Sequence, residues 1–302
     1  MKRCAVQGSK EGGMRRGAGL NKGRRGALTK RWALKAAVCI ALWVIMSLTL
    51  YAATIELYDL QISYQKIDLT GGESVKLRLV LISDLHAQSE ASSGFLSRVV
   101  EGINKIGPDY TIIAGDLVDD KAEYVQFLSP LLGLDRNKTI ILLGNHDYGP
   151  DWSDERVAER VAAWARGNGF TVLRNGDLKF SAGGKDFCII GADSLWAKRI
   201  DLEKAFKGVD DECTKILAVH EPDAALELGS QKADLILAGH THGGQVCIPF
   251  IGPFKNSKAI DDDCVAGWYD IGGIPLYVTR GIGQSLPIRF NAKPELTVMD
   301  IT

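Results

Sequence analysis

The stretch VKLRLVLISDLH at residues 75–86 decides how the chain folds, because an apolar run ends there in a cluster of polar residues. Two later runs have the same construction, YTIIAGD at 110–116 and TIILLGNHD at 139–147. Short continuous apolar runs are typical of strands that are buried on both faces of a parallel sheet. Apolar residues at helical spacing between Phe95 and Ile106 predict a helix that covers this sheet.

The same alternation of strands and helices continues through residues 56–302, which we interpret as one domain. Further strands are predicted at 55–69, 170–173, 177–181, 186–191, 214–219, 234–238, 275–279 and 295–301, and further helices at 122–133, 154–166 (with Ser153 as N-cap), 201–206 and 223–229. This order is typical of an α/β fold. In such folds ligands bind where the carboxyl ends of the parallel strands converge.

Charge is unevenly distributed along the 302 residues, although the formal net charge is only -1. Residues 1–35 hold eleven Lys and Arg and a single acid, residues 36–55 hold no charge, and residues 56–302 carry a net charge of -11. A surface that binds nucleic acid needs Lys and Arg to neutralise phosphates, so we expect no nucleic-acid partner. Apolar residues make up 46% of the chain, which excludes a disordered protein.

The uncharged stretch AAVCIALWVIMSLTLYAATI at 36–55 is long enough to cross a membrane. At about 1.5 Å rise per residue it spans a hydrocarbon layer of about 30 Å. We predict a basic cytoplasmic segment at 1–35, a transmembrane anchor at 36–55, and a domain at 56–302 on the outer face of the cell membrane. The alternatives are a buried core helix, a cleaved signal peptide, and a twin-arginine signal at GRRGAL (23–28).

The cysteines form no CxxC pair or other tight metal-ligand spacing, so they indicate neither a zinc ribbon nor a thioredoxin-type site. On the outer face of a membrane, disulfides are permitted. Cys247 and Cys264 are candidates for such a pair. The alternative is four buried free thiols, with Cys188 and Cys213 as the other two.

All five histidines directly follow apolar strands, in company with carboxylates and an asparagine. The groups are Asp84 and His86, Asp116 and Asp119, Asn145 to Asp147, His220, and His240 and His242. Residues i and i+2 of an extended segment point to the same side, so Asp84 and His86 can bind one ion. Nitrogen and oxygen ligands without thiolate suit Mn, Fe, Zn or Co. The candidate ligands are too many for one catalytic ion with an open position, so we predict two ions that share a carboxylate.

In their order and spacing, D-x-H at 84–86, GD-x-x-D at 115–119, GNHD at 144–147, the single His220 and GHTH at 239–242 resemble the signature of the calcineurin-like metallophosphoesterases. The GHTHGGQ extension, the ending RGIGQSLPIRFNAKPE (280–295) and the single N-terminal span are similar to the membrane-anchored bacterial branch of that family. The resemblance implies a four-layer α/β/β/α sandwich, the metallo-dependent phosphatase fold, after one transmembrane helix.

The resemblance also implies a role for each residue of the signature. The first ion would be bound by Asp84, His86, Asp116 and His242, and the second by the bridging Asp116 together with Asn145, His220 and His240. His146 would be catalytic: it would face the phosphate and stabilise or protonate the leaving oxygen, oriented by Asp119. Two readings stay open for Asp147, which either tunes a neighbouring ligand or caps a turn.

A metal-dependent phosphoric ester hydrolase is the function that the resemblance implies, with two divalent ions (Mn, Zn or Fe) as cofactors. A hydroxide between the ions would attack the phosphorus of a phosphomonoester or phosphodiester in line. The anchor favours a phospholipid or another cell-envelope substrate. The alternative enzyme is a pyrophosphate hydrolase of the UDP-2,3-diacylglucosamine type in lipid A synthesis, which needs a cytoplasmic site. The alternative without catalysis is a metal-stabilised, membrane-tethered binding module.

For several residues around the signature, the sequence leaves two alternative roles open. Arg280 and Arg289 meet a substrate phosphate or pair with an acid such as Glu295. Asn175 makes an Asx turn or a contact near the metals. Three tryptophans are expected to pack, with one lining a substrate groove as the alternative: Trp152, Trp164 and Trp196.

Overall fold

The computed structural model describes the backbone of residues 18–72, 74, 76–253 and 265–302. The chain divides into two compact units, Met1–Leu50 and Tyr51–Thr302. Cys264, one member of the cysteine pair considered above, lies outside the described residues.

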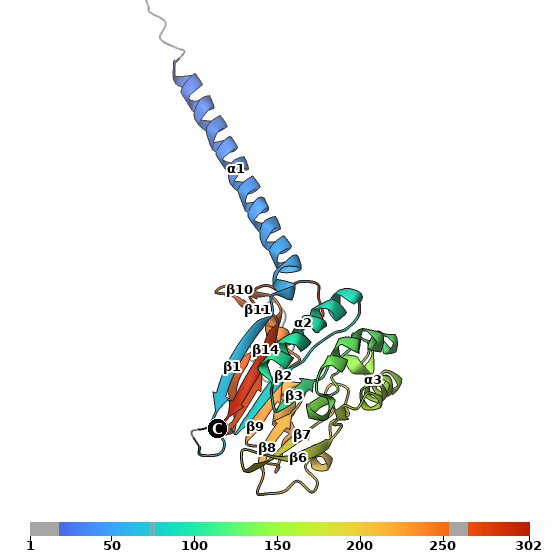
Figure 1. Cartoon of the computed structure of the whole chain (residues 1–302). Helices are drawn as coiled ribbons and strands as arrows, with labels where there is room; N and C mark the ends of the chain where they lie inside the picture. Colours follow the sequence, from blue (N-terminus) through green and yellow to red (C-terminus); the bar gives the residue numbers. More distant parts are fainter. Residues whose placement is uncertain (1–17, 73, 75, 254–264) are drawn as a thin grey trace, which may run out of the picture. The chain divides into compact units, whose positions relative to one another are not determined.

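The helix α1 spans Ala18–Thr54, and the short 3-10 helix η1 (Glu56–Tyr58) follows it (Figure 1). In the stretch Lys30–Tyr58 the mean hydropathy reaches 2.2, and 6% of this most apolar window is buried. By length and composition the stretch can cross a membrane. A core helix of a soluble protein is mostly buried, so the core-helix alternative does not fit, whereas a signal sequence meets the same criteria.

Two six-stranded sheets form the frame of the second unit. The first sheet has the order β1 (Gln61–Ile67), β14 (Glu295–Ile301), β2 (Leu77–Ile82), β3 (Tyr110–Ala114), β4 (Thr139–Leu142) and β5 (Thr171–Val172). The second has the order β12 (Gly267–Ile271), β13 (Ile274–Val278), β9 (Leu235–Ala238), β8 (Thr214–Ala218), β7 (Lys185–Gly191) and β6 (Gly176–Ala182). Each sheet contains four neighbouring strands that run parallel, β2 to β5 in the first and β7, β8, β9 and β13 in the second.

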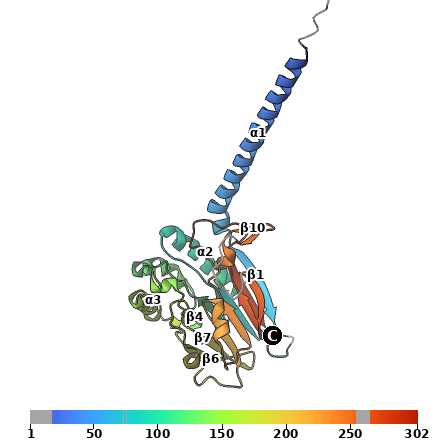
Figure 2. The same cartoon turned by 180° about the vertical axis from the view of Figure 1, so that it is seen from behind.

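Helices cover the outer face of each sheet. The helices α2 (Glu90–Ile106), η2 (Ala122–Gly133) and α3 (Glu155–Gly167) pack on the first sheet, and α4 (Leu202–Ala205) and η5 (Pro222–Glu227) pack on the second. In both views of the domain, α2 and α3 lie on the same side of the strands (Figures 1 and 2). The remaining short elements are η3 (Arg136–Lys138), η4 (His146–Tyr148), η6 (His242–Gly244), β10 (Cys247–Ile248) and β11 (Gly252–Pro253).

The alternation of side chains along β2 shows how the layers arise from the sequence. Val80 and Ile82 point to one face and join the core under α2, whereas Leu79 and Leu81 point to the other face and join the core between the sheets. All four are fully buried, as expected for a strand that is covered on both sides. The four-layer α/β/β/α sandwich that the resemblance implies is therefore confirmed.

The helix α2 connects β2 to β3 and has clear signals at both ends. Ser89 is its N-cap and shares a capping box with Ser92. Gly107 ends the helix in the left-handed conformation, with φ of 62°. The helix buries its apolar face, which includes Phe95 and Val99, against the first sheet.

Some local predictions differ from the structure. The N-cap of α3 is Asp154 and not Ser153, because the Asp154 side chain accepts from the backbone N–H of Arg156 at 3.0 Å. The segment 122–133 is a 3-10 helix that contains Pro130, which lacks the N–H of a regular α-helix. The strand β12 and the short pair β10 and β11 were not predicted.

A disulfide joins Cys188 and Cys213, with a Cα–Cα distance of 6.0 Å. Cys188 lies in β7, beside the start of β8, to which Cys213 leads. The alternative of four free thiols is therefore wrong for these two cysteines.

Candidate metal centre

Every residue of the predicted signature lies at the carboxyl end of a strand. Asp84 and His86 follow β2, Asp116 follows β3, Asn145 and His146 follow β4, His220 follows β8, and His240 and His242 follow β9. The loops after both sheets thus meet at one place between the two layers. All of these side chains except that of His146 are buried.

The buried ligands form two clusters. In the first, which comprises Asp84, His86 and His242, the ligand atoms lie within 4.8 Å of one another. His86 Nε2 is 3.2 Å from His242 Nε2, and His242 Nε2 is 3.6 Å from Asp84 Oδ1. This cluster draws its residues from both sheets.

The second cluster comprises Asp116, His220 and His240. His220 Nε2 is 3.1 Å from Asp116 Oδ2 and 3.3 Å from His240 Nδ1. The same Asp116 Oδ2 is 3.5 Å from His86 Nε2 of the first cluster. One carboxylate oxygen therefore lies between the two clusters.

These spacings fit divalent cations. Ligand atoms about 2.1 Å from a common ion are about 3.0–3.4 Å from their neighbours on it. Ring nitrogens that face one another, as in His86 and His242, are accommodated by a cation between them. Within the described part of the chain, both side-chain polar atoms of Asn145 are buried without a hydrogen-bond partner, as expected for a ligand.

In His220 and His86, the ring nitrogen that faces away from the clusters has a partner of its own. His220 Nδ1 lies 2.7 Å from the carbonyl oxygen of Ala114, which leaves Nε2 as the ligand atom. His86 Nδ1 lies 3.1 Å from Asp119 Oδ1 in the same way. The backbone N–H of His240 donates to the Asp84 carboxylate at 3.0 Å.

The carboxylate nearest to His146 is Asp120, which the sequence analysis does not single out. His146 Nδ1 is 2.6 Å from Asp120 Oδ1 and 3.7 Å from Asp119 Oδ1. Asp119 thus lies within reach of both His146 and His86 and is closer to His86, at 3.1 Å. Burial lowers the pKa of His146, but the nearby carboxylates, Asp116 first, outweigh burial and raise it to about 9.

The contacts of Asp147 agree with both of its predicted roles, at a turn and beside a neighbouring ligand. Its buried carboxylate accepts the backbone N–H groups of Leu117, Val118 and Gly144 at 3.2, 3.0 and 2.9 Å. These bonds tie the loop after β3 to the loop after β4 and so hold Asp116 next to Asn145. Burial raises the pKa of Asp147 to about 7.

Comparison with known proteins identifies this arrangement. The profile of the family described as calcineurin-like phosphoesterase matches residues 77–244, which contain both clusters. The chain belongs to that family. It is a metallophosphoesterase, a metal-dependent hydrolase of phosphoric esters.

The metallophosphoesterase is 35% identical over 230 residues to the metallophosphoesterase YkuE of Bacillus subtilis, covering 74% of this chain and 78% of that protein. It is 28% identical over 231 residues to the phosphodiesterase YaeI of Escherichia coli, covering 74% and 82%. It is 28% identical over 287 residues to a transmembrane protein with metallophosphoesterase domain of Danio rerio, covering 88% of this chain and 62% of that protein. The chain thus spans less than two thirds of the Danio rerio protein.

Two tryptophans of the metallophosphoesterase lie beside the second cluster. The Trp196 ring is 4.1 Å from the His240 ring and 5.1 Å from the Trp152 ring, measured between centroids. The sequence analysis does not single out Glu221, whose buried carboxylate accepts the backbone N–H groups of Leu195 and Trp196 and so holds this wall. The position of Glu221, an acid directly after His220, was the signal in the sequence that could have identified it.

Trp164 behaves as predicted for a packing residue, because its ring stacks on Phe170 in the core of the metallophosphoesterase. Asn175 makes no contact with the clusters in the described structure. Its side chain bonds the backbone of Asp193, Arg199 and Asp201.

The two arginines of the closing motif differ in their partners. Arg280 Nε lies 3.5 Å from Glu295 Oε2, which matches the pairing alternative. Arg289 is fully buried, and its guanidinium donates to the carbonyl oxygens of Gly283, Ala292, Arg280 and His242. Burial lowers the pKa of Arg289 to about 10. This arginine therefore holds the loop of the closing motif around His242 of the metallophosphoesterase.

Proposed function

We propose that the chain is a dinuclear phosphoesterase that hydrolyses a phosphomonoester or phosphodiester where the two sheets meet. The observation that carries the proposal is the position of Asp116 Oδ2, 3.5 Å from His86 Nε2 and 3.1 Å from His220 Nε2. Two buried ligand clusters thus share one carboxylate oxygen, which is the arrangement that a bridged pair of divalent cations needs.

The clusters support the following assignment of ligands. The first ion would be held by Asp84, His86, Asp116 and His242, and the second by Asp116, Asn145, His220 and His240. The absence of thiolate ligands from both sets favours Mn, Zn or Fe. When bound, the two ions supply an activated water and neutralise charge on the phosphoryl oxygens.

His146 acts on the leaving group. Its side chain is 22% exposed, so a substrate at the clusters can reach it. Its Nδ1 faces Asp120, which leaves Nε2 as the atom that donates a proton to the leaving oxygen. Its backbone N–H donates to Asp116 Oδ1 at 2.8 Å, which fixes the histidine beside the shared carboxylate.

We further propose that residues 36–55 cross the cell membrane, that residues 1–35 stay in the cytoplasm, and that the domain 56–302 lies on the outer face. The eleven basic residues of the first segment support this orientation. The Cys188–Cys213 disulfide also supports it, because disulfides persist in oxidising compartments. A phospholipid or another envelope phosphoester is the substrate that this location favours.

The activity is tested with the full chain in neutral detergent, stripped of metal and reloaded with Mn²⁺ or Zn²⁺. The substrates are 4-nitrophenyl phosphate and bis(4-nitrophenyl) phosphate, and the ester that is turned over faster defines the preference. We expect Asp116→Asn to lower kcat/KM more than about a hundredfold. Asp177→Asn, on the exposed side of β6, is the matched control and should leave turnover unchanged. Two bound ions without turnover of either ester would contradict the proposal.

The orientation is tested separately with reporter fusions at Thr302. A periplasmic alkaline phosphatase fusion should be active and a cytoplasmic green fluorescent protein fusion should be dark. The reverse pattern would place the domain in the cytoplasm and favour a pyrophosphate hydrolase of the UDP-2,3-diacylglucosamine type.

A further inference from the structure

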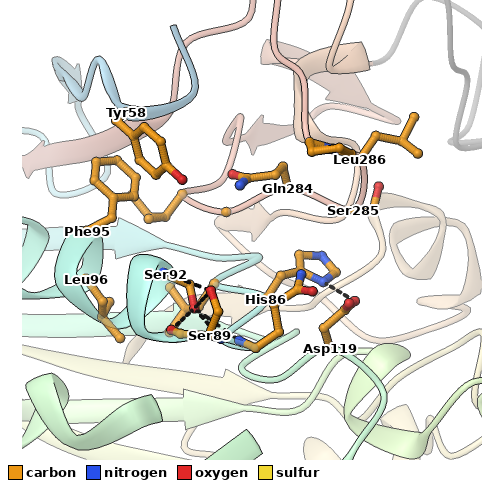
Figure 3. A pocket seen from close by; sticks show the side chains of 15 residues that line it. Tyr58, His86, Ser89, Ser92, Phe95, Leu96, Asp119, Gln284, Ser285 and Leu286 are labelled. Atoms are coloured by element: carbon orange, nitrogen blue, oxygen red, sulfur yellow. Dashed lines mark hydrogen bonds and ion pairs between the residues drawn. The ribbon is translucent and has the colours of Figure 1, made fainter. Parts of the chain in front are cut away.

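A cavity of about 260 Å³ opens beside the first ligand cluster and is in contact with His86 and Asp119 (Figure 3). Three segments line it: η1, the start of α2 with the residues just before it, and the loop 282–287 that follows β13. A ligand whose phosphate lies at the clusters would therefore extend directly into this cavity.

The lining of the cavity combines polar and apolar side chains. In Figure 3, His86 and Asp119 lie at one end, and Tyr58 and Phe95 lie at the other. Gln284 lies between these two ends. A cavity that offers hydroxyl and amide groups together with aromatic and aliphatic side chains suits an amphiphilic phosphoester.

The apolar end of the cavity is built before any ligand binds. The rings of Tyr58 and Phe95 meet edge to face with centroids 5.4 Å apart. The Arg98 guanidinium lies 4.9 Å from the Phe95 centroid and donates to the carbonyl oxygen of Tyr58 at 3.3 Å. Such contacts lower the entropic cost of binding, because the wall is already ordered.

The opposite wall is also fixed. Gln245, itself buried, donates from Nε2 to the carbonyl oxygens of Leu286 and Ile288 at 2.6 and 3.0 Å. The side chain of Leu286 stays 43% exposed although its backbone is held. An apolar side chain is thereby presented at the rim of a cavity that is otherwise polar near the clusters.

Tyr58 connects the cavity to the apolar N-terminal stretch. It is the last residue of Lys30–Tyr58, the stretch that can cross a membrane. The junction is firmly attached to the domain, since the backbone N–H of Arg289 donates to Ala52 at 3.1 Å and that of Ala292 donates to Glu56 Oε1 at 2.9 Å. Tyr58 therefore both lines the cavity and ends the apolar stretch.

We propose that this cavity binds the first part of the hydrocarbon chain of an amphiphilic phosphoester whose phosphate lies at the ligand clusters. The substrate class is a phosphate ester with a long alkyl or acyl chain, as in a membrane lipid. This inference rests on the proposed phosphoesterase function and adds the residues that select the substrate, Tyr58, Phe95 and Leu286. With a volume of about 260 Å³, the cavity takes only the start of a long chain.

The proposal predicts a dependence on chain length that ends when the cavity is full. The probes are 4-nitrophenyl phosphodiesters with methyl, butyl, hexyl, octyl and dodecyl chains, assayed with the full chain in phosphatidylcholine nanodiscs. Each methylene that enters the cavity should raise kcat/KM by about two- to fourfold. The increase should stop before the dodecyl ester, because the last methylenes of a long chain lie outside the cavity.

Leu286→Asp places a charge at the rim and should abolish the dependence on chain length, measured as the ratio of kcat/KM for the octyl ester to kcat/KM for the methyl ester. The matched control is Leu226→Asp, since Leu226 is a 59% exposed leucine in η5 that does not line the cavity. This control also corrects for partition of the longer esters into the nanodisc. A dependence that persists in Leu286→Asp, or turnover of all esters at one rate by the unaltered chain, would overturn the proposal for the cavity. Failure to turn over any ester with two ions bound would instead overturn the proposed phosphoesterase function.

Binding gives a second readout that needs no turnover. Calorimetry should show that octylphosphonate binds to the metal-loaded chain at least tenfold more tightly than methylphosphonate. The difference should disappear in Tyr58→Ser, which removes the aromatic wall, and persist in Leu226→Asp. Equal affinities of the two phosphonates for the unaltered chain would refute the cavity as the site of the hydrocarbon chain.

Discussion

Replacing Asp120 by Asn tests whether this carboxylate, rather than Asp119, holds the proton of His146. Asp120 Oδ1 lies 2.6 Å from His146 Nδ1, and Asp119 Oδ1 lies 3.7 Å away. A hydrogen bond to a charged group contributes about 1.5–3 kcal/mol, and one pKa unit corresponds to about 1.36 kcal/mol. We therefore expect Asp120→Asn to lower the pKa of His146 by about 1–2 units from its value of about 9.

The same pKa links the folding of the metal-free chain to pH. An imidazole in an unfolded chain has a pKa of about 6.5, so the folded state binds this proton more tightly. The resulting stabilisation is fully present below about pH 6.5 and is lost as the pH rises through about 9. It amounts to at most about 3.4 kcal/mol, since His146 is partly exposed and solvent screens its partners. Asp120→Asn should remove roughly half of it.

The assay is a nitrogen-15 NMR titration of the imidazoles in the metal-stripped full chain, with labelled histidine. The chain has five histidines, so the resonances can be assigned by substitution. Asp119→Asn is the control, and it should move the pKa of His146 less than Asp120→Asn does. An unchanged pKa of His146 in Asp120→Asn, or a larger shift in Asp119→Asn, would refute the reasoning.

Three further substitutions test the frame of the site. Gly144→Ala should lower metal content measured by mass spectrometry, because its Cβ would collide with the Asp116 carboxylate, whereas Gly176→Ala has open space and should not. Cys213→Ser opens a disulfide with a sequence separation of 25 residues and should lower the free energy of unfolding in urea by about 3 kcal/mol. Arg289→Lys leaves at least one buried carbonyl without a donor and should cost about 1–3 kcal/mol in the same titration.

The layers and the strand-end clusters could be predicted because they depend on the period of the apolar pattern. Leu79 and Leu81 alternate with Val80 and Ile82, and this alternation alone requires a covered face on each side of β2. The carboxyl ends of parallel strands then meet at one edge of the sheet, and this does not depend on the conformation of the loops. The hairpin of β12 and β13 was also within reach, since Gly272 and Gly273 form its two-residue turn, with φ of 63° and 91°.

Two other details depend on backbone geometry and strand register, which one sequence does not reveal. Asp119 and Asp120 are adjacent acids, and which of them faces His146 is decided by the backbone, where Asp120 has φ of 66°. The Cys188–Cys213 disulfide depends on the register of β7 against β8, in which Cys188 lies opposite Lys215. Neither a rotamer nor a register between distant strands can be derived from one sequence.

The backbone at the site also departs from the extended geometry that the i and i+2 argument assumes. Five of the proposed ligands are in the left-handed region, namely Asp84, His86, Asp116, His240 and His242, with φ between 42° and 72°. Such conformations cost about 1–3 kcal/mol each, toward the lower end for Asp and His. Together this is comparable with the total stability of a typical domain, about 5–15 kcal/mol.

The strained conformations persist because hydrogen bonds between neighbouring loops determine them from several sides. The backbone N–H of Asp84 donates to Gly115 and that of His86 donates to Asp116, both at 3.0 Å, so the loops after β2 and β3 hold each other. Ile282 and Gly283 donate back to Ser83 and Asp84 at 2.9 and 2.6 Å, which adds the closing loop. The ligands are therefore positioned by the two sheets, and the stability of the sheets supports that geometry. This explains why a residue as remote from the clusters in sequence as Arg289, which fixes the closing loop, belongs to the metal centre.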